Sequence, residues 1–118
     1  AYASGGSPAS ASASLTAQGG GLVPPATAML LPAWPNPARF GTRFRFALPA
    51  GAGDRATLTV LDPSGRRVRV FTGPFTAGVN ELAWDGLDGD GRPVRSGLYF
   101  FELVMPGTRI AHRLVVVR

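Results

Sequence analysis

Apolar and polar side chains alternate with a period of two over most of the chain from Arg39 onward. This period places successive side chains on opposite faces of an extended strand, whereas an amphipathic helix needs apolar residues every three or four positions. About seven short runs of this kind, separated by turn residues, indicate a single antiparallel β-sandwich. We expect strands at residues 28–31, 42–48, 55–62, 66–71, 80–85, 98–105 and 108–118.

The alternation also predicts which side chains face the core. In the run at 42–48, Phe44, Phe46 and Leu48 share one face, and Arg43 and Arg45 take the other. The other residues expected to face inward are Ala56, Leu58, Val60, Val68, Val70, Tyr99, Phe101 and Leu103.

Three further expectations concern the other faces of the strands. Thr57 and Thr59 are predicted to point outward, as are Arg67 and Arg69. Residues 114–117 are apolar on both faces, which predicts a strand that is covered on both sides.

Charge divides the chain into two unequal parts. All 12 basic and 7 acidic residues lie at or after Arg39, and the start of the chain consists largely of Ala, Ser and Gly. Ordering such a segment costs more backbone entropy than burying its few apolar side chains returns. We therefore expect a low-complexity arm or linker at residues 1–26 and a β-sandwich domain at 27–118.

The segment at 9–17 is small, uncharged and mostly alternating. A peptide of this kind can add as a strand to an exposed sheet edge, and the alternative is a flexible linker. The strand-addition hypothesis predicts contact with a second copy, and hence a homo-oligomer or polymer. The residues of this predicted assembly arm are Ala9, Ser10, Ala11, Ser12, Ala13, Ser14, Leu15, Thr16 and Ala17.

Composition excludes several classes of protein. The sequence contains no cysteine, which excludes disulfides and thiolate zinc sites. No apolar run is long enough for a transmembrane helix. Arginines 43, 45, 67 and 69 are expected to share one outward face, but nucleic-acid modules interleave such a stripe with exposed aromatic rings. Because the neighbouring phenylalanines are expected in the core, we do not expect a nucleic-acid partner.

Several motifs occur in the order typical of one kind of domain. They are residues 35–37 (PNP), 45–49 (RFALP), 58–68 (LTVLDPSGRRV), 84–94 (WDGLDGDGRPV) and 96–99 (SGLY). With these motifs, residues 29–118 resemble the immunoglobulin-like domain of flagellar hook-capping proteins, and equally the C-terminal sorting domains of type IX secretion substrates. The resemblance implies an immunoglobulin-like, fibronectin III-like sandwich of seven strands. It also implies an exported protein that is often attached to the cell surface, after removal of a signal peptide.

The motif residues also have roles that follow from their chemistry. Glycines can adopt the positive φ of tight turns, prolines stiffen the segment that leads into the sandwich, and buried Trp or Tyr needs a polar partner. The family's usual aromatic residue after PNP is Ala38 here, and Phe40 is expected to substitute for it. The structural motif residues are Pro35, Asn36, Pro37, Gly65, Trp84, Asp85, Gly91, Gly97 and Tyr99.

Candidates for catalysis are few. His112 is the single histidine and lies within a predicted strand, while Ser64 and Ser96 lie in turns without a nearby base in sequence. We therefore expect no enzymatic activity and no catalytic residue.

Asp85, Asp88 and Asp90 are the best metal candidates, because carboxylates at this spacing can bind calcium. The spacing fails the EF-hand pattern, and aspartates also form turns by binding nearby backbone amides. Turn formation is the favoured interpretation, and calcium is the alternative. We expect no other cofactor.

Three functions follow from these observations. The first is an extracellular structural subunit that assembles into a surface filament or layer through its N-terminal arm. The second is a C-terminal sorting or anchoring module of the type IX kind, whose partner is the secretion apparatus. The third is a ligand- or carbohydrate-binding module that uses residues 86–97. No passenger domain precedes the module in this sequence, which favours a filament subunit or a fragment.

Overall fold

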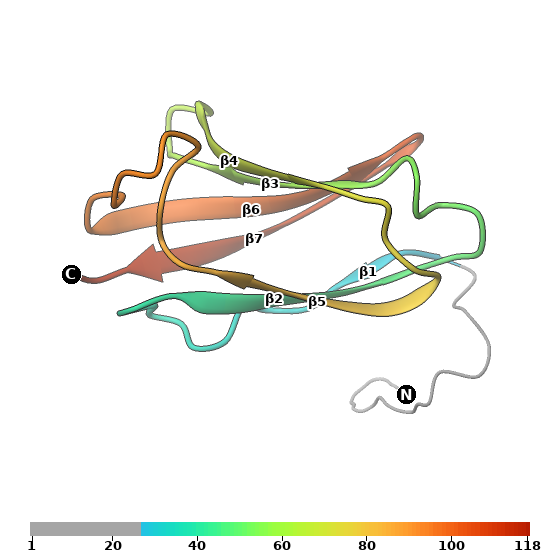
Figure 1. The fold of residues 1–118 in the computed structure, drawn as a ribbon, viewed down its shortest axis with the longest axis horizontal. Coiled ribbons are helices and arrows are strands. Elements are labelled where there is room, and N and C mark those ends of the chain that lie inside the picture. The colour runs from blue at the N-terminus through green and yellow to red at the C-terminus, as the bar shows by residue number, and fades with distance from the viewer. Residues whose placement is uncertain (1–26) are drawn as a thin grey trace.

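The computed structural model describes residues 27–118, which form two antiparallel sheets packed face to face (Figure 1). One sheet has the strand order β1-β2-β5, and the other has the order β4-β3-β6-β7. The predicted β-sandwich is confirmed, whereas the arm at residues 1–26 lies outside the described residues. The strands are β1 (Met29–Leu30), β2 (Thr42–Leu48), β3 (Thr57–Leu61), β4 (Arg67–Thr72), β5 (Gly78–Trp84), β6 (Gly97–Met105) and β7 (Thr108–Val116).

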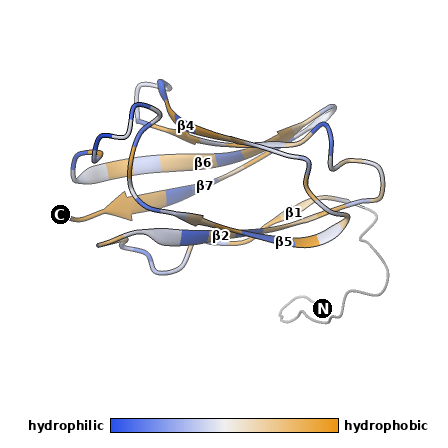
Figure 2. Ribbon diagram, in the orientation of Figure 1, coloured by the Kyte–Doolittle hydropathy of each residue, from blue (hydrophilic) through white to orange (hydrophobic). Residues whose placement is uncertain are grey.

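Aromatic rings fill the space between the two sheets. The ring of Phe44, from β2, lies 4.7 Å from that of Phe101 on the opposite sheet and 6.1 Å from that of Trp84 on β5. Offset and tilted rings at such separations stabilise a core beyond the effect of buried area. Figure 2 shows that apolar residues recur along strands of both sheets. Within residues 27–118 no helix is long and apolar enough to cross a membrane.

Strand β2 shows the alternation that its sequence predicts. Phe44, Phe46 and Leu48 are at most 1% exposed, while Arg43 and Arg45 are exposed on the outer face. This strand pairs with β5 along its whole length without a register shift. The pairing fixes which face of each strand enters the core.

One residue of β3 is outward-facing but covered. Thr59 lies on the face opposite to the buried Leu58 and Val60, yet its side chain is only 7% exposed. Because β3 is a central strand, Thr59 lies between its cross-strand neighbours Val70 and Glu102. Neighbouring side chains on a sheet face stand close enough to cover one another.

A β-bulge changes the faces of β4. The register shifts between Val60 and Leu61, so Arg69 pairs with Val60, whereas Arg67 pairs with Leu61. A single extra residue reverses the alternation of the strand that carries it. The prediction that Arg69 points outward and Val70 inward is therefore wrong: Val70 is 43% exposed, and Arg69 faces the core side.

Strand β7 is an edge strand and is covered on one face only. Leu114 and Val116 are at most 3% exposed, but Val115 between them is 38% exposed. The prediction of a strand covered on both sides is therefore wrong. The outward-facing Val115 therefore lies on an exposed sheet face and is not covered by a further layer of the described residues.

The segment between β1 and β2 leaves the three-stranded sheet, pairs with the free edge of β7 in the other sheet and then returns. Ala38 forms a parallel bridge with Val116, in which the amide of Ala38 donates to the carbonyl of Val115 at 2.7 Å. The Asn36 carboxamide oxygen accepts from the amide of Val115 at 3.0 Å, and His112 Nε2–H donates to the carbonyl of Leu30 at 2.7 Å. These contacts tie the two sheets together along one side of the sandwich.

Candidate functional site

The turn between β3 and β4 is organised by one carboxylate. Asp62 Oδ1 accepts hydrogen bonds from the amide and hydroxyl of Ser64, at 3.0 and 2.6 Å, and from the amide of Arg66 at 3.0 Å. The Ser64 hydroxyl and then the Arg66 amide lower the pKa of Asp62, because both stabilise the charged form. Gly65 has a positive φ of 88°, a conformation that glycine adopts without steric cost.

The same five-residue arrangement recurs in the connection between β5 and β6. Asp88 Oδ1 accepts from the amides of Asp90 and Arg92, each at 2.9 Å, and Gly91 has a φ of 82°. The hydrogen bond from the Arg92 amide is the largest cause of a lowered pKa for Asp88. The amide of Gly89 donates to the carbonyl of Val68 at 3.0 Å, so the second turn packs against β4.

Two of the three aspartates predicted as metal candidates accept hydrogen bonds from nearby protein groups. Asp85 Oδ1 accepts from the amide of Leu87 at 3.0 Å and from Arg69 Nη1 at 3.3 Å, while Asp88 binds the amides described above. The described residues contain no group of three or more metal-binding side chains. These contacts support turn formation as the role of Asp85 and Asp88, and Asp90 contributes its amide to the same turn.

The two large motif residues have the polar partners that burial demands. The indole N–H of Trp84 donates to the carbonyl of Leu87 at 2.8 Å, and the hydroxyl of Tyr99 donates to the carbonyl of Arg95 at 2.7 Å. Gly97, between them in the chain, has a φ of 152°. Each bond fixes the β5–β6 connection to the core, so this connection is held at both ends.

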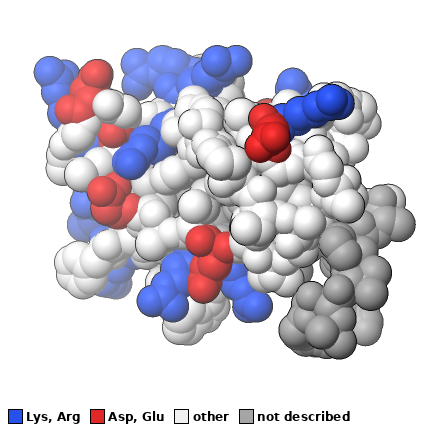
Figure 3. Space-filling model, turned by 45° about the vertical axis from the view of Figure 1, so that its right-hand side comes forward, with Lys and Arg blue, Asp and Glu red and all other residues white. Residues whose placement is uncertain are grey.

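The arginines do not form the single stripe that the sequence predicts. Arg43 and Arg45 lie on the three-stranded sheet, whereas Arg67 and Arg69 lie on β4 of the four-stranded sheet. Arg69 is turned toward Asp85 and the carbonyl of Leu87, at 3.3 and 3.1 Å. Figure 3 shows acidic side chains interspersed among the basic ones.

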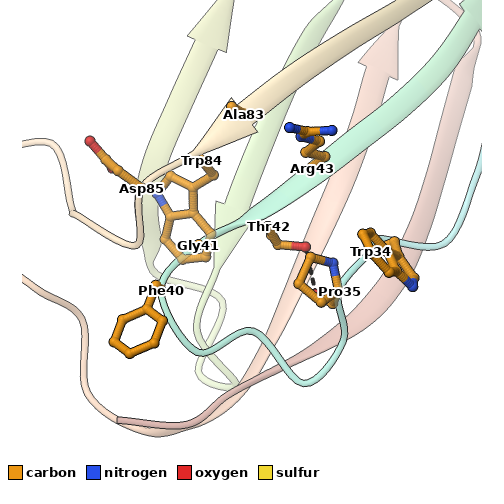
Figure 4. A pocket seen from close by; sticks show the side chains of 9 residues that line it. All are labelled: Trp34, Pro35, Phe40, Gly41, Thr42, Arg43, Ala83, Trp84 and Asp85. Carbon is orange, nitrogen blue, oxygen red and sulfur yellow. Dashed lines mark hydrogen bonds between the residues drawn. The ribbon is translucent and has the colours of Figure 1, made fainter.

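A hollow of ≈ 420 Å³ opens at one end of the three-stranded sheet, where β2 begins and β5 ends. Two aromatic side chains, Trp34 and Phe40, lie on opposite sides of it, with Pro35 and Thr42 between them (Figure 4). Arg43 and Asp85 add one positive and one negative group to the lining. This hollow is the candidate site for a ligand on the described part of the chain.

The backbone around the hollow is fixed by hydrogen bonds. The amide of Trp34 donates to the carbonyl of Arg43 at 3.2 Å, and the amide of Arg43 donates back to the carbonyl of Trp34 at 2.9 Å. The hydroxyl of Thr42 donates to the carbonyl of Pro35 at 2.7 Å (Figure 4). The Trp34 side chain therefore projects from a defined backbone position.

Comparison with known protein families shows which family this domain belongs to. Residues 38–106 match the family model described as the FlgD Ig-like domain. The chain belongs to this family. No protein with curated annotation matches the chain.

Two solved structures resemble this FlgD Ig-like domain at 26% sequence identity and a TM-score of 0.56. One is PorZ of Porphyromonas gingivalis, described as an essential bacterial surface component of the type IX secretion system; the likeness covers 75% of this chain and 11% of PorZ. The other is dimeric latent PorU of the same organism, for which the likeness covers 76% of this chain and 9% of PorU. The chain thus spans about a tenth of each of these proteins.

Sequence reasoning did not find the hollow of this FlgD Ig-like domain. It predicts that Phe40 substitutes for the family's usual aromatic residue after PNP, whereas the structure leaves Phe40 90% exposed and buries the small side chain of Ala38 at 2%. Trp34, an apolar residue of the proline-rich segment before residue 39, is 74% exposed. Two bulky aromatic residues within a segment that cannot form a central strand are the signal that could have indicated a surface site.

Proposed function

We propose that this domain is a non-catalytic attachment module that directs the protein carrying it to the cell surface through type IX secretion. The observation that carries this proposal is the likeness to PorZ, which combines 26% identity with coverage of 75% of this chain. The match of residues 38–106 to the FlgD Ig-like domain supports the same kind of module by analogy of fold.

The contacts of the polar candidates support a role without catalysis. His112 binds the carbonyl of Leu30 through Nε2, and the Ser64 hydroxyl donates to Asp62. The hydroxyl oxygen of Ser96 accepts from the amide of Arg118 at 2.8 Å. Each of these groups serves a turn or a strand, and Asp62, the carboxylate that accepts from Ser64, is itself engaged by the amides of the same turn.

A reporter fusion tests the proposal. A periplasm-directed fluorescent reporter is joined to residues 1–118, or to residues 27–118, in a bacterium that has type IX secretion. We expect both fusions at the cell surface, detected by antibody labelling of intact cells. The matched control is the same pair in a strain without the secretion apparatus, where the reporter should stay inside. Equal labelling in both strains, or none in either, would refute the proposal.

The filament hypothesis remains a prediction. It rests on residues 9–17, which lie outside the described residues, and no comparison bears on self-assembly. The extracellular or surface location that both hypotheses require is supported by the description of PorZ as a surface component.

A further inference from the structure

Exposed aromatic rings of the described chain are concentrated at the hollow. Trp34 is 74% exposed and Phe40 is 90% exposed, whereas the other exposed large apolar side chains range from 38% to 54%. Every other aromatic ring in residues 27–118 is at least partly buried. Neither Trp34 nor Phe40 contributes to the core, so the fold alone does not explain why two large rings flank one hollow.

The hollow presents these rings on a rigid backbone. Trp34 and Arg43 exchange two backbone hydrogen bonds, and Thr42 binds the carbonyl of Pro35. On the other side, Gly41 passes so close to the backbone of β5 that an added Cβ would lie 2.6 Å from the carbonyl oxygen of Trp84. This close passage anchors the chain directly after Phe40. A surface fixed in advance loses little entropy when a ligand binds.

The polar groups at the hollow have opposite charges. The guanidinium of Arg43 forms no ion pair or hydrogen bond with another side chain of residues 27–118, and Asp85 engages only Oδ1, leaving Oδ2 unpaired within the same range. Arg43 can only donate hydrogen bonds and ionised Asp85 can only accept them. Arg69 already pairs with Oδ1 of Asp85, so this carboxylate offers Oδ2 as an acceptor rather than a free charge for a cation, and Arg43 offers donors. The two groups therefore complement a neutral ligand that both donates and accepts.

We propose that this hollow binds a neutral β-linked glycan. The C–H bonds on the flat face of a pyranose ring carry slight positive charge and are attracted to the electron-rich face of an indole or phenyl ring. Sugar hydroxyls can donate to Asp85 and accept from Arg43. A concave site with aromatic walls and a few polar groups is the usual form of a small-molecule site. This inference does not depend on the route of export.

The experiment uses the full chain and three probes: cellohexaose, xylohexaose and β-1,4-mannohexaose, with an oligogalacturonate as the acidic comparison. Affinity is measured by titration calorimetry. The chain contains two tryptophans, of which Trp84 is 2% exposed. Fluorescence quenching by acrylamide therefore reports on Trp34. We expect at least one neutral probe to bind and to protect Trp34 from quenching.

Substitutions locate the site. Trp34→Ala and Phe40→Ala should each weaken binding by at least about tenfold, which corresponds to roughly 1.4 kcal/mol. Val79→Ala is the matched control, because Val79 is 54% exposed, lies on the same sheet and does not line the hollow. All three positions are exposed, and circular dichroism verifies that the variants fold.

Four results would overturn the proposal. They are no binding of any neutral probe, binding of the acidic oligomer alone, equal loss in Val79→Ala and Trp34→Ala, or binding without protection of Trp34. Light scattering is recorded in parallel, and an association of the chain that Trp34→Ala abolishes would instead assign the hollow to contact between copies. A failed reporter fusion would leave this result unchanged, so the two proposals fail independently.

Discussion

At the scale of single residues, two aspartates perform the same task in two different connections. Asp62 and Asp88 each begin a five-residue turn with a glycine at the fourth position and an arginine at the fifth. Local turn chemistry of this kind can be predicted from sequence, because every partner lies within four residues. The burial of Ala38 in place of Phe40 is harder to predict, since Ala38 pairs with Val116, which is far away in the chain, while Phe40 is 90% exposed.

These turns predict how stability depends on pH. The pKa of each carboxylate is lowered in the folded state, so its hydrogen bonds contribute stability above about pH 4 and lose that contribution as the pH falls through the folded-state pKa. The double variant Asp62→Asn/Asp88→Asn should melt at a lower temperature than the natural chain at about pH 6, and the difference should shrink toward about pH 3.

Melting temperature measured by circular dichroism across this pH range checks the expectation. Asp90→Asn is the control, because the Asp90 side chain accepts no hydrogen bond from another residue of 27–118. A gap between the double variant and the natural chain that stays constant over the whole pH range would contradict the prediction.

At the scale of elements, sequence predicts where strands lie better than it predicts which way they face. The ranges expected for β2 and β6 agree with the structure to within a residue. The faces of β4 could not be predicted, because the bulge opposite Val60 and Leu61 reverses every side chain beyond it. The apolar run in β7 was misleading for another reason: composition does not tell whether a second layer covers a strand.

The bulge predicts unequal effects of two neighbouring arginines. Arg69 lies over the ring of Phe71, 5.0 Å from its centroid, and binds Asp85 and the carbonyl of Leu87. Arg69→Ala should lower the free energy of unfolding by about 1–2 kcal/mol, because it removes these contacts together. Arg67→Ala, at an exposed position, should change it by less than about 0.5 kcal/mol.

Urea unfolding, with the same m-value in all three proteins, provides the comparison. Equal destabilisation by the two substitutions would mean that β4 follows the simple alternation of its sequence rather than the bulged register.

At the scale of the whole molecule, the described domain contains its own core. Within residues 27–118, the buried apolar side chains from Leu30 to Val116 form one cluster between the two sheets. The relation between this domain and residues 1–26 in solution remains a prediction that truncation can test.

Removal of residues 1–26 should leave the free energy of unfolding within about 0.5 kcal/mol of the full chain, because the core cluster described within 27–118 is retained whole. Calorimetry of both proteins measures this. Light scattering of the same samples tests the filament hypothesis, which predicts an associating full chain and a monomeric truncated one. A truncated chain that fails to fold would contradict the first expectation, and two monomers would contradict the second.

The parallel bridge between Ala38 and Val116 has a mechanical consequence. When the chain is pulled from its two ends, the segment around Ala38 and strand β7 are drawn in opposite directions along their length. The hydrogen bonds between them are then loaded in shear, and several must break together instead of opening one after another. Under tension, the domain would therefore resist unfolding mainly at this contact, where the first and last parts of the sandwich lie side by side.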